Sequence, residues 1–367
     1  MIKDNKPLFH PTFGSRPAQI VGREDLIQEC LRGLAEPIGS RERCRFYTGQ
    51  RGMGKTALLL ELAERAASMD YVVAHVTAYE GMNEDLVETI QRKGAPFIPA
   101  PKKTVSGASA GAMGFSFGLT FSEEAKEQFG FRTKMSMLCE ALEKQGKGIL
   151  ILVDETKSSE AMRQLAITYQ HLVGEERNVA IIMAGLPHAV SDVLNDDVLT
   201  FLNRAYKEPL QPIRTSEIRH YYTEAFRRSG VHLTDAAVDH AAASASGFPY
   251  LMQLIGYYIV RQGAGEKSKN EKWVDDAISE AVRDLADNVF APILSPLSDN
   301  DLAFLRAMAI DSGASKISEI CKRMKKENSY IQPYRARMIA AGIVESPRKG
   351  TLVFAVPYLG EYLRHQQ

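Results

Sequence analysis

The sequence predicts an α/β fold in which helices cover both faces of a parallel β-sheet. In the first half of the chain, short apolar segments alternate with segments whose apolar residues recur at helical spacing. The segment 149–153, Ile-Leu-Ile-Leu-Val, is apolar without alternation, as expected of a strand buried on both faces. With 367 residues, the chain has room for two or three domains of ordinary size.

The elements of this core can be placed in order. Strands are predicted at 43–48, 71–78, 148–153 and 179–184, and helices at 57–68, 83–93 and 160–173. The apolar stripe of the last helix, from Met162 to Val173, is best explained as core. Between 96 and 122 the composition shifts to glycine, serine, alanine and proline. There Met113, Phe115, Phe117, Leu119 and Phe121 alternate with small or polar residues, which suggests either an exposed inserted hairpin or an irregular loop.

Helices dominate the second half of the chain. They are predicted at 215–229, 234–246, 249–262 and 273–290, with Thr234 as an N-cap and Gly247 as a helix stop. After a proline-flanked break, helices at 299–311, 317–326 and 329–341 precede strands at 343–346 and 351–356. This last order is typical of a winged helix. We therefore expect an N-terminal extension (1–19), a core (20–208), a helical lid (209–292) and a winged-helix domain (293–367).

A glycine-rich segment after the first strand matches the pattern GxxxxGKT. Its residues, with the helical residue that follows, are Gly49, Gln50, Arg51, Gly52, Met53, Gly54, Lys55, Thr56 and Ala57. Glycines allow backbone amides to turn inward around a polyphosphate, and the helix N-terminus adds partial positive charge. In this pattern the lysine reaches the terminal phosphates and the threonine ligates Mg²⁺. The predicted strand before the loop and helix after it are the required context, so we expect a nucleotide site.

Two acidic residues, Asp154 and Glu155, directly follow the buried strand. An aspartate in this position can hold Mg²⁺, and an adjacent glutamate can orient and activate the attacking water. The simpler alternative is that two acids merely end a strand at the surface. With the phosphate loop upstream, the pair favours hydrolysis as well as binding.

Five motifs together resemble those of the AAA+ P-loop ATPases. They are IVGRE at 20–24, the phosphate loop, the strand ending in Asp154 and Glu155, AGLP at 184–187, and GFP at 247–249. The resemblance covers residues 20–290. Within the AAA+ family, the chain resembles the branch near the origin-recognition initiators and the STAND signalling ATPases. This resemblance implies ATP or ADP with Mg²⁺ as cofactors, Val21, Gly22 and Arg23 at the adenine, and a lid that carries Pro249 beside the nucleotide.

The chain departs from that pattern at two sensor positions. Tyr250 follows the GFP step, where initiator ATPases usually place an arginine, and the strand 179–184 is followed by Gly185 rather than a polar sensor. We therefore expect slow hydrolysis. The resemblance also places Arg204 where related ATPases present an arginine to a neighbouring subunit's nucleotide, which would make it catalytic in an oligomer. A solvated arginine on a helix end is the alternative.

Charge separates the last domain from the rest. Lysine plus arginine equals aspartate plus glutamate at 45 each, which excludes a uniformly positive protein. Residues 298–367, however, hold eleven lysines and arginines against seven acids. The basic residues considered for DNA are Lys322, Arg323, Lys325, Lys326, Arg335, Arg337, Arg348 and Lys349. They suit salt-sensitive contacts to double-stranded DNA, or else form the solvated face of a protein-binding module.

The remaining features exclude other classes. The four cysteines, Cys30, Cys44, Cys139 and Cys321, are too widely spaced for a zinc site or a disulfide framework. No apolar run reaches the roughly 18 residues of a membrane span. We expect a cytoplasmic protein.

Two functions remain in competition. The first is a Mg²⁺-dependent ATPase that acts on DNA through its winged helix, with ATP controlling assembly or conformation. The second is a STAND-like nucleotide-gated switch whose winged helix docks a protein. A kinase is disfavoured because nothing in the sequence suggests a phosphoryl acceptor site.

Overall fold

The computed structural model describes residues 7–12, 16–98, 115–117, 119–121, 123–263 and 272–366. They form two compact units, which we describe separately. The sheet unit comprises Asp25–Thr48 and Leu58–Pro209. The helical unit comprises Met1–Glu24, Gly49–Ala57 and Leu210–Gln367, so the phosphate loop groups with the second half of the chain.

The sheet unit is built on five parallel strands, which confirms the predicted parallel sheet and adds a fifth strand to the four predicted. They are β1 (Cys44–Thr48), β2 (Tyr71–Thr77), β5 (Gly148–Asp154), β6 (Val179–Gly185) and β7 (Tyr206–Pro209), in the order β2-β5-β6-β1-β7. Every residue of β5 and β6 is buried, which explains their unbroken apolar sequences. The edge strand β7 was not predicted, because its sequence Tyr-Lys-Glu-Pro carries no apolar run.

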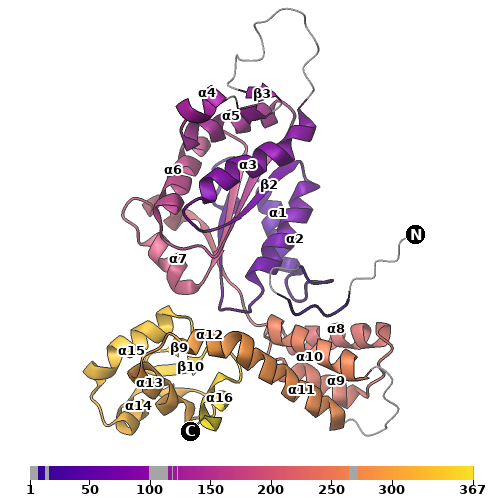
Figure 1. The fold of residues 1–367 in the computed structure, drawn as a ribbon, viewed down its shortest axis with the longest axis vertical. Coiled ribbons are helices and arrows are strands. Elements are labelled where there is room, and N and C mark those ends of the chain that lie inside the picture. The colour runs from indigo at the N-terminus through magenta and orange to yellow at the C-terminus, as the bar shows by residue number, and fades with distance from the viewer. Residues whose placement is uncertain are drawn as a thin grey trace, which may run out of the picture. The chain divides into compact units, whose positions relative to one another are not determined.

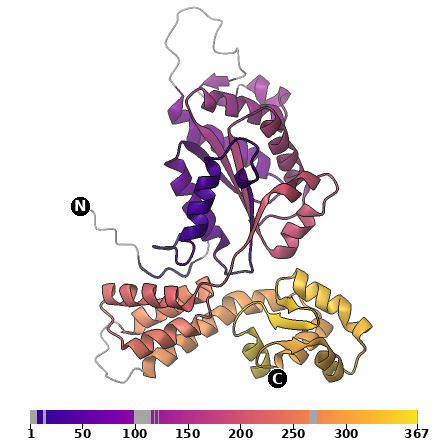
Figure 2. The same cartoon turned by 180° about the vertical axis from the view of Figure 1, so that it is seen from behind.

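Helices cover both faces of this sheet (Figure 1). They are α1 (Glu24–Leu34), α2 (Lys55–Ala67), α3 (Met82–Gly94), α4 (Glu123–Gln128), α5 (Phe131–Glu143), α6 (Glu160–Gly174) and α7 (Pro187–Leu194). Alternate strand residues share one buried cluster with α3, α5, α6 and α7. The opposite face is covered by α1 and α2; Figure 2 shows indigo α1 and pink α6 on opposite sides of the strands. The apolar stripe predicted for α6 is core, since Met162, Leu165 and Leu172 are fully buried.

The inserted segment 96–122 is only partly described. Strands β3 (Phe115–Phe117) and β4 (Thr120–Phe121) pair antiparallel as a short hairpin. Leu119 and Phe121 are 1% and 2% exposed and join the core cluster under α3 and α5. The expectation of an exposed arm is therefore wrong for this end of the hairpin, because Leu119 and Phe121 are buried in the protein's own core. Met113 lies outside the described residues.

The helical unit contains the predicted lid and the predicted C-terminal module. Its helices are α8 (Thr215–Arg228), α9 (Asp235–Ser244), α10 (Pro249–Gly263), α11 (Lys272–Leu285), α12 (Ala291–Leu294), α13 (Asp299–Ala309), α14 (Ile317–Met324), α15 (Asn328–Ala340) and α16 (Leu359–His365). Thr234 caps α9 as expected, accepting a hydrogen bond from the Ala237 amide. Pro333 lies inside α15, and the helix continues through it.

The C-terminal module has the element order expected of a winged helix. Strands β8 (Ser315–Lys316), β9 (Val344–Arg348) and β10 (Thr351–Phe354) form an antiparallel sheet in the order β8-β10-β9, behind helices α13, α14 and α15. One continuous hydrophobic cluster joins the module to the lid. Within it, the Phe290 and Tyr362 ring centroids lie 5.2 Å apart. In the described part of the chain, no helix is both long enough and apolar enough to span a bilayer.

Candidate nucleotide site

The phosphate loop has the backbone that its glycines permit. Gly52 and Gly54 have φ of +81° and +79°, a region that favours glycine. A Cβ on Gly52 would lie 2.5 Å from Phe248 Cζ, so a side chain is excluded by contact as well as by φ. Lys55 begins α2 and is 6% exposed. Its Nζ donates to the main-chain oxygens of Gly49 at 2.9 Å and Gln50 at 3.1 Å, which places a buried cation on the inner side of the loop.

The start of α10 packs directly on this loop. The Tyr250 amide donates to the Gly52 oxygen at 3.2 Å, and Pro249 would lie 3.7 Å from a Cβ on Gly54. Gly247 turns the chain into this helix with φ of +71°, and its Cβ would meet Ile213 O at 2.7 Å. The lid residue Pro249 therefore lies beside the phosphate loop.

The segment Val21–Arg23 lies in the same unit. Val21 is buried in the large hydrophobic cluster that also contains Met53 of the loop and Phe248 of the lid. Gly22 has φ of +66° and packs against Glu217 of α8. Arg23 is 7% exposed, and its Nη2 atom has no hydrogen-bond partner among the described residues. Burial lowers the pKa of Arg23, an effect that Glu217 opposes. A buried donor without a partner fits a site that receives an acceptor from a ligand.

The two acidic residues end β5 in the sheet unit. Asp154 is 5% exposed, and its Oδ1 accepts a hydrogen bond from the Glu155 amide at 2.8 Å. Glu155 has φ of +50°, so the chain turns sharply and leaves its side chain exposed. The carboxyl ends of β5 and β1 lie at the same edge of the sheet with only β6 between them, about 10 Å apart at ordinary strand spacing. Since the phosphate loop follows β1 directly, Asp154 stands at the edge where that loop begins.

One histidine near Asp154 was not predicted. His75 of β2 has a buried Nε2 with no hydrogen-bond partner in the described chain. Burial lowers the pKa of His75, while the Asp154 carboxylate opposes this shift. The sequence offered no indication, because a lone histidine in an apolar strand is usually a core residue.

At Gly185, which ends β6, there is no room for the polar sensor side chain that related ATPases carry after this strand. A Cβ there would lie 2.8 Å from the Thr156 oxygen. The close approach of the Asp154–Thr156 turn to β6 therefore explains why the strand ends without a side chain.

Arg204 lies at the other edge of the sheet. It ends the 3₁₀ turn Thr200–Arg204 just before β7, which runs parallel to β1. The turn therefore stands at the amino edge of the sheet, a strand length of about 16 Å from the edge that carries Asp154. The side chain is exposed. Sequence reasoning placed Arg204 with the catalytic residues; the fold separates it from Asp154 and Glu155 of its own chain.

A contact that no motif indicated joins the loop to the C-terminal module. Gln50 is 6% exposed, and its Nε2 donates to Glu345 Oε1 of β9 at 3.0 Å. The other amide atom, Gln50 Oε1, is buried with no partner among the described residues. A carboxylate from the wing therefore lies beside the phosphate loop. The two residues are 295 positions apart, so only the folded chain reveals the pair.

The predicted DNA-facing residues of the module are not equivalent. Three hold carboxylates: Lys322 pairs with Glu319 at 2.8 Å, Arg323 with Asp311 at 2.6 Å, and Arg337 with Asp301 at 2.6 Å. Five form no ion pair with a carboxylate of the described chain: Lys325, Lys326, Arg335, Arg348 and Lys349. Lys326 instead lies over the Tyr330 ring at 4.7 Å. The charge without a carboxylate partner is thus smaller than the composition suggested and lies between α14 and α15, on α15 itself and on the wing.

Known proteins resemble this chain in fold far more than in sequence. Residues 287–363 match the model of a domain of unknown function, DUF8462. No curated protein matches the chain by sequence. Among solved structures, a Walker-type ATPase of Pyrococcus abyssi has a TM-score of 0.70 at 15% identity, covering 95% of this chain and 97% of that one. The Aeropyrum pernix ORC2 protein, solved as ADPNP–ADP complexes, has a TM-score of 0.61 at 15% identity, covering 97% and 95%. These likenesses concern the fold alone, and at that level they confirm the resemblance read from the motifs.

Proposed function

We propose that this chain, whose fold is that of the AAA+ P-loop ATPases, binds ATP with Mg²⁺ and hydrolyses it slowly. The observation that carries the proposal is the phosphate loop itself, with its two positive-φ glycines and a buried lysine on its inner side. In the bound state Lys55 exchanges its loop carbonyls for phosphate oxygens. Thr56 and Asp154 would hold Mg²⁺, which would neutralise charge on the phosphates.

The remaining site residues have separate tasks. Glu155 accepts a proton from the attacking water or orients it, since its exposed carboxylate is adjacent to Asp154. Arg23, with its unpartnered Nη2, binds the nucleotide from the Val21–Arg23 segment. Pro249 and the start of α10 close over the phosphate loop. Hydrolysis is slow because Tyr250 stands where initiator ATPases usually have an arginine.

The test is ATP turnover and nucleotide binding by the full chain. Lys55→Ala should abolish tight nucleotide binding. Glu155→Gln should keep binding and lose about a hundredfold in turnover, the typical contribution of a positioned acid–base group. Glu160→Gln, an exposed acid at the start of α6, serves as the matched control. Unchanged turnover in Glu155→Gln would contradict the assignment of Glu155.

Arg204 acts, in this proposal, on the nucleotide of a second copy. Its position at the amino edge supports an action outside its own site, because the edge of Asp154 lies a strand length away. Mixing Arg204→Ala with Lys55→Ala chains tests this. Each inactive chain supplies what the other lacks, so turnover recovers in the mixture only if Arg204 works across an interface.

The C-terminal module binds double-stranded DNA through the five unpaired basic residues. Changing both Arg348 and Lys349 to alanine should lower the slope of log affinity against log salt by about two. The adjacent pair Arg227 and Arg228 on α8, both exposed, is the matched control. If DNA changes neither turnover nor binding, the module docks a protein instead.

ATP controls the module through Gln50 and Glu345. Phosphates entering the loop approach the Glu345 carboxylate, whose charge has the same sign. Nucleotide binding therefore weakens the hold of β9 on the loop and changes how the module meets its partner.

A further inference from the structure

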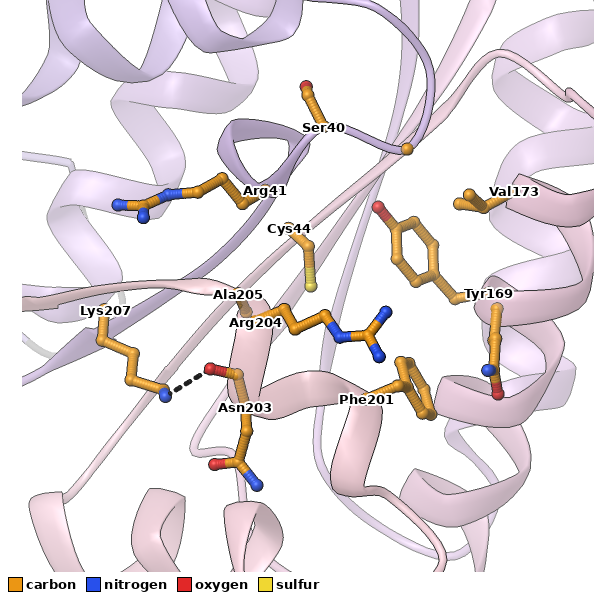
Figure 3. A pocket seen from close by; sticks show the side chains of 12 residues that line it. Ser40, Arg41, Cys44, Tyr169, Val173, Phe201, Asn203, Arg204, Ala205 and Lys207 are labelled. Carbon is orange, nitrogen blue, oxygen red and sulfur yellow. Dashed lines mark hydrogen bonds between the residues drawn. The ribbon is translucent and has the colours of Figure 1, made fainter.

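A cavity lies at the amino edge of the sheet, where β1 and β7 begin. It has a volume of about 800 Å³ and is lined by the turn before β1, by α6, and by the 3₁₀ turn that leads into β7 (Figure 3). Cys44, the first residue of β1, forms part of its wall. Because Asp154 and Glu155 stand at the opposite edge of the sheet, this cavity is separate from those two proposed catalytic residues.

The lining carries positive charge that the described protein does not neutralise. Arg204 has no hydrogen bond or ion pair with any described residue. The Lys207 ammonium donates only to the Asn203 main-chain oxygen, at 2.8 Å (Figure 3). Arginines of neighbouring elements behave differently: Arg163 pairs with Asp196 at 2.6 Å, and Arg177 with Glu143 at 3.3 Å. The Arg204 guanidinium therefore differs from these neighbouring arginines, because it lies in a cavity without a carboxylate partner.

No lining group supplies a compensating negative charge. None of the residues that line the cavity is an aspartate or a glutamate. Burial raises the pKa of the Cys44 thiol to about 12, so the thiol is neutral at physiological pH. Burial also raises the pKa of Tyr169. Arg41 at the rim is the one lining cation with a carboxylate partner, Glu42 at 3.3 Å.

The rest of the wall combines apolar and aromatic residues with the uncharged polar residues Ser40, Gln170 and Asn203. Tyr169 of α6 is 5% exposed, and Cys44 is 8% exposed. The Arg204 side chain extends across the cavity with its guanidinium between Tyr169 and Phe201, while Arg41 points to the other side (Figure 3). A cavity of this size, with an apolar wall and a few polar groups, is typical of small-molecule sites.

We infer that this cavity binds a small phosphorylated ring compound. Arg204 holds the phosphate in a charge-assisted fork, and the ring packs against Phe201 and Tyr169. Lys207 lies on the other side of the lining from the Arg204 guanidinium and adds positive charge at a distance (Figure 3). A phosphate suits the site because a guanidinium matches two of its oxygens at once. No residue of the phosphate loop takes part, so the inference does not require ATP binding by the same chain. It assigns Arg204 to a ligand of its own chain, whereas the proposed function assigns it to the nucleotide of a second copy, and the test below distinguishes the two.

The test uses the full chain with phenyl phosphate and inorganic phosphate as probes. Binding is measured by calorimetry with saturating Mg²⁺–ADP in every sample, so that the phosphate loop is occupied. Arg204→Ala should weaken phenyl phosphate binding at least about tenfold, the usual cost of losing a charge-assisted pair. Phe201→Ala should weaken phenyl phosphate and leave inorganic phosphate unchanged. Arg92→Ala, an exposed arginine of α3 outside the cavity, is the matched control.

Two results would overturn the inference. The first is phenyl phosphate binding that Arg204→Ala and Phe201→Ala leave unchanged. The second comes from sedimentation of the same samples. It would be phenyl phosphate binding only to oligomers of the chain, or phenyl phosphate dissociating those oligomers. In either case the ring and phosphate that fill the cavity belong to the nucleotide of a second copy. Lys55→Ala separates the two proposals, because it should lose ADP and keep phenyl phosphate.

Discussion

Replacing Glu345 should tighten nucleotide binding, because its carboxylate competes with phosphate for the loop. The Gln50–Glu345 hydrogen bond is 3.0 Å long, with Gln50 buried and Glu345 exposed. A bond of this kind contributes a net of about 1 kcal/mol, which corresponds to about a fivefold change in an equilibrium constant. Glu345→Ala removes both the bond and the charge. It should therefore raise the affinity for Mg²⁺–ATP about fivefold.

A second variant separates charge from hydrogen bonding. Glu345→Gln keeps an acceptor for Gln50 and removes the charge. Its gain in ATP affinity should be largest at low salt and fade as salt screens the interaction. Glu361→Gln on α16, an exposed glutamate of the same module, is the control. The assay is a titration of the full chain with Mg²⁺–ATP at two ionic strengths. Unchanged or weaker binding in both Glu345 variants would refute the argument.

Three further predictions concern stability. Gly52→Ala should cost about 1–3 kcal/mol and abolish nucleotide binding, since its Cβ would meet the Phe248 ring in a backbone region that disfavours alanine. Phe121→Ala should cost about 3–5 kcal/mol, as for other buried aromatics, whereas an exposed arm would tolerate it. The hydrogen bond from Arg323 holds the pKa of Asp311 below its ordinary value, so this carboxylate stabilises the fold above about pH 4. That stability should be lost as pH falls through the lowered pKa, and Asp311→Asn should remove this part of the pH dependence.

Urea unfolding of the full chain measures all three, each against its own reference. Gly146 has φ of +69°, and no atom lies within 4 Å of a Cβ added there. Gly146→Ala therefore measures the cost of the backbone conformation without the steric clash that is present at Gly52. Ile38→Ala, an exposed apolar residue, is the reference for Phe121. For Asp311, midpoints are compared from pH 3 to pH 7. Equal costs at Gly52 and Gly146, a neutral Phe121→Ala, or an unchanged pH profile in Asp311→Asn would each contradict the corresponding structural explanation.

Local patterns predicted the core well because each is written within a few consecutive residues. The apolar run of β5 has no alternation since both faces of that strand are covered, and the glycines of the phosphate loop are required by its own backbone angles. The helix N-cap at Thr234 is equally local. The edge strand β7 was missed because a half-exposed strand needs no apolar run.

Predictions from the sequence were wrong where one residue pattern fits two structures that differ only in tertiary packing. Alternation at Leu119 and Phe121 fits an exposed arm or a hairpin turned onto the core, and the core residues of α3 and α5 decide the matter. A basic residue in a sequence also carries no record of its partner. Arg337 is held by Asp301, 36 positions away, so its charge is committed to the fold.

The sequence by itself determined the fold class, the phosphate loop and the acidic end of β5, because these depend on residue type and short spacing. The tertiary structure decided everything that depends on distant residues meeting. It placed Glu345 on Gln50, separated Arg204 from Asp154 by the length of the sheet, and left Arg204 without a carboxylate in a cavity of its own. The physical reason is that contact energies depend on distance in space, and spacing along the chain fixes that distance only within single elements.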